Sequence, residues 1–395
     1  MAGIKSIGIL TSGGDAPGMN AAIRAVTRSA IYNGFTVKGI MRGFKGLVFN
    51  EIVEFKSQSV SNIIQLGGTI LKTARSEEFK TVEGRKAAYD NMVAAGIDAL
   101  VVIGGDGSLT GAGLFAEEYN VPIVGLPGTI DNDLFGTDHC PGFGSAAKYV
   151  AASVAEIARD AYCYFVDSVT IVEIMGRNAG FLTAASALAR SENLCAPDLI
   201  YLPEHQFDVN EFLSDVKDKI KKHKNVIVAV SEGIKNKDGV YVAAASDVLQ
   251  NDKFGHAQLG GAAKTLENIV KTEIGCKCRS VEINVLQRAA SHFASKTDLA
   301  ESFKIGKTAV SYALRGVSGE MMIFERENGE NYKIKISSMD INLIANKEKT
   351  LPENFINARG NDVTKAFINY ARPLILGEEK IKTKDGIPVH LVLKR

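Results

Sequence analysis

The feature of the chain that most constrains its fold is the alternation of short apolar runs with amphipathic segments. The apolar runs predict buried β-strands over residues 4–10, 35–41, 99–103, 123–126, 169–174, 199–202 and 226–230. Apolar residues recur at helical spacing over residues 19–30, 83–95, 109–118, 144–159, 179–190 and 209–222. Strands that alternate with helices predict mostly parallel sheets covered by helices on both faces, an α/β fold.

The size and composition of the chain limit its class. A length of 395 residues predicts two or three domains. The net charge of +1 favours neither nucleic acid nor an anionic membrane, so an anionic substrate would need a local site. The five cysteines are scattered, and Cys276 and Cys278 lack a second Cys/His cluster, which favours reduced thiols over disulfides or a zinc site. We therefore expect a cytoplasmic protein.

Glycine-rich turns follow several predicted strands, at the ends where open parallel sheets bind ligands. Gly14 lies in TSGGDAPGMN, where backbone N–H groups can approach an anion closely. In GGDGS, Gly107 and Ser108 would leave space for phosphates, and Asp106 offers a hard oxygen ligand for Mg²⁺. The alternatives are a tight turn without a ligand and an aspartate that caps the following helix.

Two carboxylates, Asp131 and Asp133, lie two residues apart in PGTIDND, after a predicted strand. Such a pair repels unless a metal or a substrate proton compensates, so one can accept a hydroxyl proton while the other holds the base or a metal. The alternative is an exposed acidic turn. Arg177 in MGRN could pair bidentately with phosphate, although an arginine is usually a surface residue; the same holds for Arg279 and Arg288.

Together, TSGGDAPGMNAAIR, GGDGS, PGTIDND, MGRNAG and VLQR resemble the phosphofructokinase family in content, order and spacing, over about residues 4–320. The resemblance implies two Rossmann-like domains, with mostly parallel sheets sandwiched by helices and an active site in the interdomain cleft. The nucleotide-binding domain would comprise residues 1–144 plus about 289–345. The fructose-6-phosphate-binding domain would comprise residues 145–288 plus about 346–395.

The resemblance also implies roles for individual residues. Asp131 would be the general base for the sugar 1-hydroxyl, supported by Gly128, Thr129 and Arg177. Asp106 would bind Mg²⁺. The donor nucleotide would contact Gly14, Phe44, Arg75, Gly107, Ser108 and Gly111. The sugar phosphate would contact Thr129, Asp131, Asp133, Met175, Gly176, Arg177, Glu232, Arg279 and Arg288.

The implied reaction is the glycolytic transfer of the γ-phosphoryl group of MgATP to fructose 6-phosphate. The implied enzyme is a cytoplasmic homo-oligomer, a dimer or tetramer, without a nucleic-acid or membrane partner. Pyrophosphate-using relatives generally carry Asp at the position of Gly107 and Lys at that of Gly128, so glycine at both would leave room for ATP. Three alternatives stay open: the same reaction with pyrophosphate, an NAD or lipid kinase, and a non-catalytic nucleotide or sugar-phosphate sensor.

The chain departs from the family pattern at several positions, among them Ala289-Ala290, where bacterial ATP-using enzymes typically have Gly-Gly. Ser168 stands where bacterial ATP-using enzymes typically have an arginine donated from a neighbouring subunit, and Val285 stands where they typically have histidine. The resemblance therefore leaves open how the 6-phosphate is held.

Overall fold

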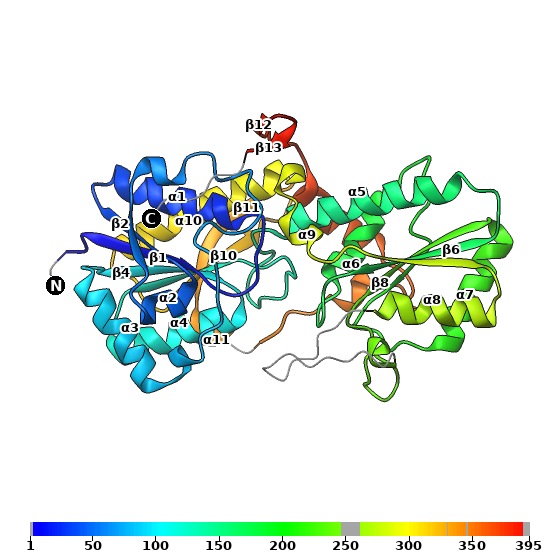
Figure 1. Ribbon diagram of the computed structural model, residues 1–395, viewed down its shortest axis with the longest axis horizontal. Helices are drawn as coiled ribbons and strands as arrows, with labels where there is room; N and C mark the ends of the chain where they lie inside the picture. Colours follow the sequence, from blue (N-terminus) through cyan, green and yellow to red (C-terminus); the bar gives the residue numbers. More distant parts are fainter. Residues whose placement is uncertain (1–2, 246–260, 330, 345–346, 390–395) are drawn as a thin grey trace.

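The computed structural model describes residues 3–245, 261–329, 331–344 and 347–389. Two sheets lie side by side, each between layers of helices (Figure 1). Among the described residues, the first sheet has seven strands and the second has four. This is the α/β architecture with mostly parallel sheets that the alternating pattern predicts.

The first sheet has the strand order β11-β10-β5-β4-β1-β2-β3. Its five central strands run parallel, and the edge strands β3 and β11 are antiparallel to their neighbours. Successive side chains of a strand point to opposite faces, so Ile7 and Ile9 belong to one core and Leu10 to another. The strands are β1 Ser6–Thr11, β2 Thr36–Ile40, β3 Ile52–Phe55, β4 Ala99–Gly104, β5 Ile123–Pro127, β10 Glu320–Arg326 and β11 Ile334–Asp340.

Helices cover both faces of the first sheet. Helices α1 and α10 pack against each other on one face, while α2, α3 and α4 share a core on the other, and α11 packs against α4. These helices are α1 Met19–Tyr32, α2 Gly43–Val48, α3 Val82–Ala94, α4 Asp106–Tyr119, α10 Lys296–Leu314 and α11 Ile341–Ile344.

The second sheet is parallel throughout and has the order β7-β8-β6-β9. Helices α5 and α6 pack on one face, and α7 and α8 pack on the other. The strands are β6 Ser168–Ile174, β7 Leu199–Tyr201, β8 Asn225–Ser231 and β9 Lys277–Glu282. The helices are α5 Phe143–Tyr162, α6 Phe181–Ala185, α7 Val209–Lys222 and α8 Ala262–Glu273.

Neither half of the molecule is continuous in sequence. The chain leaves the second sheet through α9 Leu286–Ala289 and returns to the first half with α10, β10 and β11. It then crosses back, and α12 Lys365–Ala371 packs against α6 (Figure 1). A short hairpin, β12 Thr383–Lys384 and β13 Ile387–Pro388, follows. The domain boundary predicted near residue 345 lies outside the described residues, and the predicted division stays a prediction.

The predicted elements are largely confirmed. Each predicted strand is present within two residues of its expected ends, and the predicted helices are present too. The helix predicted over residues 179–190 is divided into α6 and the 3₁₀ helix η3 Ser186–Ala189. Strands β3, β10 and β11 and the hairpin of β12 and β13 were not predicted. In the part of the chain that the structure describes, no helix is both long enough and apolar enough to cross a membrane.

Candidate active site

The carboxyl ends of β1, β4 and β5 lie level with one another in the first sheet. Thr11 is in register with Ile103, and Gly104 is in register with Pro127. The loops that follow these strands contain the motifs TSGGDAPGMN, GGDGS and PGTIDND. Folding therefore brings the motifs to the edge of the sheet where ligands of open parallel sheets bind.

The backbone of the two glycine-rich loops is accessible. Apart from the adjoining residues and, for Gly107, the backbone of its own helix, no atom of the described residues lies within 4 Å of a Cβ built on Gly14 or Gly107. Gly105 is the N-cap of α4 and makes no side-chain capping bond, while Asp106 is the first helical residue and Ser108 is buried in the first turn. The alternative role of Asp106 as the capping residue is therefore wrong. The helix N-terminus adds a dipole that favours an anion.

The remaining predicted nucleotide residues differ in their surroundings. The buried ring of Phe44 stacks on Phe79, with the ring centroids 4.1 Å apart. A Cβ on Gly111 would lie 3.5 Å from Phe79 and 3.6 Å from Phe44. Phe44 thus supports the beginning of α4 from the core, whereas Arg75 is exposed. Their contacts with a nucleotide stay predictions.

Gly128 has a packing role that we did not predict. A Cβ at this position would lie 2.9 Å from Cγ2 of Ile103 and 3.1 Å from Cε of Met19. We expected glycine here to leave room for ATP, and the structure corrects that expectation, because the chain itself occupies the space. Of the two glycines in the donor argument, Gly107 alone has open space at its Cβ position.

Asp131 lies where charged residues of both halves meet. Its carboxylate is half-buried. Burial raises the pKa of Asp131 to about 7, and the negative charges of Asp133 and Glu232 add to the rise, while Arg288 and Arg177 oppose it. A carboxylate with a pKa near neutrality suits a general base. The alternative of an exposed acidic turn is therefore wrong.

Thr129 and Asp133 lie on either side of Asp131. Oγ1 of Thr129 accepts a hydrogen bond of 3.2 Å from the backbone N–H of Asp131, which fixes the beginning of the turn. Burial raises the pKa of Asp133, and the carboxylates of Glu348 and Asp106 add to the rise. Asp133 and Asp106 are therefore close enough to interact electrostatically.

This pair of carboxylates fits a magnesium ion. Mg²⁺ prefers oxygen ligands and is usually bound by one or two carboxylates together with substrate phosphates. Asp106 and Asp133 provide such oxygens beside the open glycine backbone. In the described ranges, no group of three or more His, Cys, Asp or Glu residues forms a metal site. Asp106 as the ligand stays a prediction.

The second sheet contributes the predicted sugar-phosphate side at the ends of β6 and β8. Ile174 and Ser231 are in register there. Gly176 follows with a φ of +131°, and a Cβ on it would lie 2.6 Å from the carbonyl oxygen of Ala179, so the turn requires glycine. The N–H of Gly176 donates to Oε1 of Glu232 at 3.4 Å. Burial raises the pKa of Glu232 to about 7.

Met175 connects this turn to helix α9. Its backbone N–H donates to Oε1 of Gln287 at 3.4 Å, and Arg288 is the next residue of α9. The charges of Arg288 and Arg177 both act on Asp131. The structure therefore brings together, from two sheets and one short helix, a carboxylate and two of the three predicted arginines.

Arg279 lies apart from this group. It is three residues before the end of β9, and its guanidinium pairs with Asp160 near the end of α5 at 3.0 Å. We expected Arg279 at the sugar phosphate, and the single chain does not place it there. Among the departures from the family pattern, Ser168 accepts a hydrogen bond of 2.9 Å from Asn225, and Val285 is exposed.

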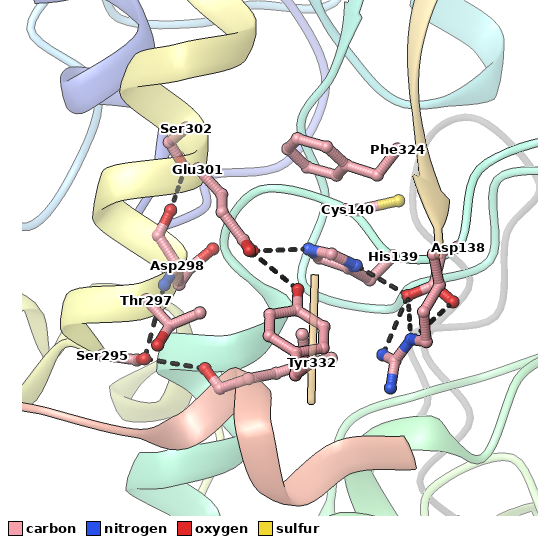
Figure 2. Close-up of polar contacts among 12 residues, drawn as sticks. Asp138, His139, Cys140, Ser295, Thr297, Asp298, Glu301, Ser302, Phe324 and Tyr332 are labelled. Carbon is pink, nitrogen blue, oxygen red and sulfur yellow. Dashed lines mark hydrogen bonds and ion pairs between the residues drawn. The ribbon is translucent and has the colours of Figure 1, made fainter. Parts of the chain in front are cut away.

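A buried polar array anchors the loop that follows the Asp131 turn (Figure 2). Nδ1 of His139 lies 2.8 Å from Asp138 and Nε2 lies 2.9 Å from Glu301 of α10. Burial disfavours a charged imidazole, but the two carboxylates outweigh it and raise the pKa of His139. Arg326 of β10 pairs with Asp138 at 2.9 Å. The loop is thus attached to two elements of the first half.

Our sequence reasoning missed three residues around this turn. Asn132 lies between the two acidic residues, and Lys349 and Tyr370 contact it from the last part of the chain. Lys349 belongs to a Lys/Glu-rich stretch whose composition is typical of solvated surface. Nothing in the sequence pattern distinguishes it from its charged neighbours.

Comparison with known proteins agrees with this site. Residues 6–283 match the family described as Phosphofructokinase. ATP-dependent 6-phosphofructokinase 2 of Bacteroides thetaiotaomicron is 51% identical over 282 residues, which are 70% of this chain and 84% of that protein. The pyrophosphate–fructose 6-phosphate 1-phosphotransferase of Xanthomonas campestris is 36% identical over 397 residues, with 97% and 94% coverage.

A solved structure is similar over almost the whole chain. The pyrophosphate-dependent phosphofructokinase from Nitrosospira multiformis superposes with a TM-score of 0.88 at 31% identity, covering 99% of this chain and 96% of that one. A half-buried carboxylate with a raised pKa, together with accessible glycine loops and two arginines that act on it, suits phosphoryl transfer. The chain belongs to the phosphofructokinase family.

Proposed function

We propose that the chain is an ATP-dependent 6-phosphofructokinase, which transfers the γ-phosphoryl group of MgATP to the 1-hydroxyl of fructose 6-phosphate and yields fructose 1,6-bisphosphate and ADP. The proposal rests above all on the environment of Asp131. Its half-buried carboxylate has a pKa raised to about 7, two arginines act on its charge, and the glycine loops of the same sheet edge are open. It can accept a proton from a sugar hydroxyl at neutral pH.

The reaction proceeds by in-line transfer in this proposal. Backbone N–H groups at Gly14 and Gly107 hold the donor phosphates, and Arg177 and Arg288 hold the acceptor, which sets the reacting atoms in line. Asp131 takes the hydroxyl proton as the sugar oxygen attacks phosphorus. Mg²⁺ bound at Asp106 would neutralise phosphate charge.

The choice of ATP as the donor is supported by Gly107. Apart from adjoining residues and the backbone of α4, no atom of the described residues lies within 4 Å of its Cβ position, whereas an aspartate there would add a negative charge facing the donor phosphates. The relative at 51% identity is named as ATP-dependent. The test compares kcat/KM for ATP and for pyrophosphate at saturating fructose 6-phosphate. We expect a higher value with ATP, and a clearly higher value with pyrophosphate would overturn the donor assignment.

Pyrophosphate is the second candidate donor, for one specific reason. The Xanthomonas campestris protein matches 97% of this chain and is named for pyrophosphate, whereas the Bacteroides thetaiotaomicron protein matches 70%. The donor comparison decides between them. Turnover with either donor would exclude the non-catalytic sensor, and turnover restricted to fructose 6-phosphate in an acceptor screen would exclude an NAD or lipid kinase.

The proposal includes a cytoplasmic homo-oligomer that acts on small molecules. An oligomer would give Arg279 a role, because this arginine, which its own chain pairs with Asp160, could serve the site of a neighbouring subunit. Light scattering of the purified protein measures the mass directly. A monomer with full activity would contradict this part of the proposal.

A further inference from the structure

Asn132, between the two acidic residues of the catalytic turn, has an unusual backbone conformation. Its φ is +60°, a left-handed value that a residue with a side chain adopts at a cost in free energy. Its side chain is fully buried. A buried residue in this conformation keeps it only if its surroundings hold it there, and the turn sets the directions of both neighbouring carboxylates.

Lys349 holds this turn from the inside. Its ammonium donates to Oδ1 of Asn132 at 3.3 Å and to the carbonyl oxygens of Thr137 and Asp138 at 3.0 and 2.9 Å. These three acceptors match the three protons of an ammonium group. The backbone N–H of Lys349 also donates to the carbonyl oxygen of Asp133 at 2.7 Å. One residue thus joins both ends of the loop.

Tyr370 of α12 is a second residue that holds the side chain of Asn132. Its hydroxyl accepts a hydrogen bond of 2.8 Å from Nδ2 of Asn132 and donates one of 2.7 Å to the carbonyl oxygen of Asp138. Oδ1 of Asn132 also accepts from the backbone N–H of Cys140 at 3.0 Å. The amide of Asn132 is therefore fixed from three directions, two of which come from the last fifty residues of the chain.

The same segment also contacts the sugar-phosphate side. The carboxylate of Glu348 accepts a hydrogen bond from Asn178, the residue after Arg177. The backbone N–H of Leu351 donates to Glu204 at 2.9 Å, and the same carboxylate oxygen accepts from Gly180 at 2.8 Å. Residues 348–351 therefore connect the loop of the base to the loop of the phosphate-binding arginine. They lie beyond residue 283, where the family match ends.

We propose that Lys349 and Tyr370 are positioning residues for the phosphoryl transfer, which hold Asn132 so that Asp131 points at the acceptor hydroxyl. The inference rests on the proposed function. Neither residue acts on the substrate. A displacement of the base by about 1 Å can lower a rate about 10²-fold, so even a small shift of Asn132 would lower kcat measurably. The arginines lie on other elements, so substrate affinity would change little.

The experiment compares Lys349→Met with Lys347→Met in the full chain. Lys347 is a matched control, because it is two residues away and exposed, and it lies over the ring of Phe135 without a part in the turn. We expect Lys349→Met to lower kcat about 10- to 100-fold, with KM for fructose 6-phosphate and for the donor within about twofold. Lys347→Met should stay within about twofold in every constant.

Tyr370→Phe is the second variant, because it removes one hydroxyl and keeps the ring. We expect kcat to fall about 3- to 10-fold at constant KM. If both residues act through Asn132, the double variant should lose about as much kcat as Lys349→Met alone, not the product of the two losses. Unchanged kcat in either folded variant, a rise in KM equal to the fall in kcat, or a multiplicative double variant would overturn the proposal. If Lys349→Met fails to fold, Tyr370→Phe decides alone.

Amide hydrogen exchange separates this inference from the proposed function. Faster exchange confined to the loop 129–140 in both variants is expected, and it is measurable without any substrate. If the wild type transfers phosphate from neither ATP nor pyrophosphate, the proposed function fails, and unaltered exchange in the variants would separately refute the anchoring of Asn132.

Discussion

Replacing Asp131 with asparagine should lower turnover and stabilise the fold at the same time. Asparagine has nearly the same size but cannot accept the hydroxyl proton, and a positioned base contributes about 10²- to 10⁴-fold in rate. We therefore expect kcat to fall at least about 10²-fold, with little change in nucleotide binding. The gain in stability has a separate cause, which is the removal of a half-buried negative charge.

The size of that gain follows from the pKa. The pKa of Asp131 rises from its ordinary 3.8 to about 7 in the folded protein. A pKa that is raised on folding contributes stability below pH 3.8 that is lost as the pH rises through 7. At about 1.4 kcal/mol per unit, the full penalty at pH 8 is at most about 4 kcal/mol. Because the carboxylate is partly exposed and has charged neighbours, we expect about 1–3 kcal/mol.

The assay combines kinetics with thermal unfolding at pH 5 and pH 8. For a chain of 395 residues, an unfolding entropy of about 0.8 kcal/mol per kelvin converts the gain into a rise in Tm of about 1–4 °C at pH 8. The rise should be smaller at pH 5. Asp238→Asn, an exposed aspartate, is the control and should change neither quantity. Near-normal kcat, or a lower Tm at pH 8, would refute the assignment of Asp131 as a buried base.

Three further predictions concern Glu232, Arg288 and Gly107. Glu232→Gln removes a negative charge that raises the pKa of Asp131, so the acidic limb of the pH profile of kcat/KM should move to lower pH; an unmoved limb would contradict the electrostatic coupling. Arg288→Ala removes an opposing cation, so the limb should move to higher pH, and KM for fructose 6-phosphate should rise at least about tenfold. Gly107→Asp should lower kcat/KM for ATP by more than that for pyrophosphate; equal losses, measured in the same assay, would show that Gly107 does not select the donor.

Strands and helices were predictable where the residue pattern of a single segment is enough to identify them. Buried parallel strands such as β4 and β8 are continuous apolar runs, and the helices between them have clear periodicity. The edge strands β3 and β11 were not predicted, because their polar and apolar residues are mixed. Strand β10 contains a short apolar run, Met321–Phe324, which our reading of the sequence passed over. Their positions depend on pairing with strands that are distant in sequence.

The site was predictable to a similar extent. Glycine loops and carboxylates can be recognised by their residue types at the ends of predicted strands. Asp131, Gly107 and Arg177 were therefore found before their contacts were known. The packing role of Gly128 depends on the side chains of Ile103 and Met19, which no local pattern specifies. The ion pair of Arg279 with Asp160 likewise depends on which helix packs near β9, and no local pattern specifies that helix.

The family match covers less of the chain than the fold requires, because the last part of the chain also belongs to the structure. Residues 6–283 contain every predicted motif except VLQR, yet the first sheet also needs β10 and β11, and α1 packs extensively on α10. A chain that ended at residue 283 would leave β5 as an exposed edge and α1 without its partner. It would also lose the ammonium of Lys349 and the hydroxyl of Tyr370 from the catalytic turn. The motifs therefore provide the reacting groups, and the later segments fix where those groups point.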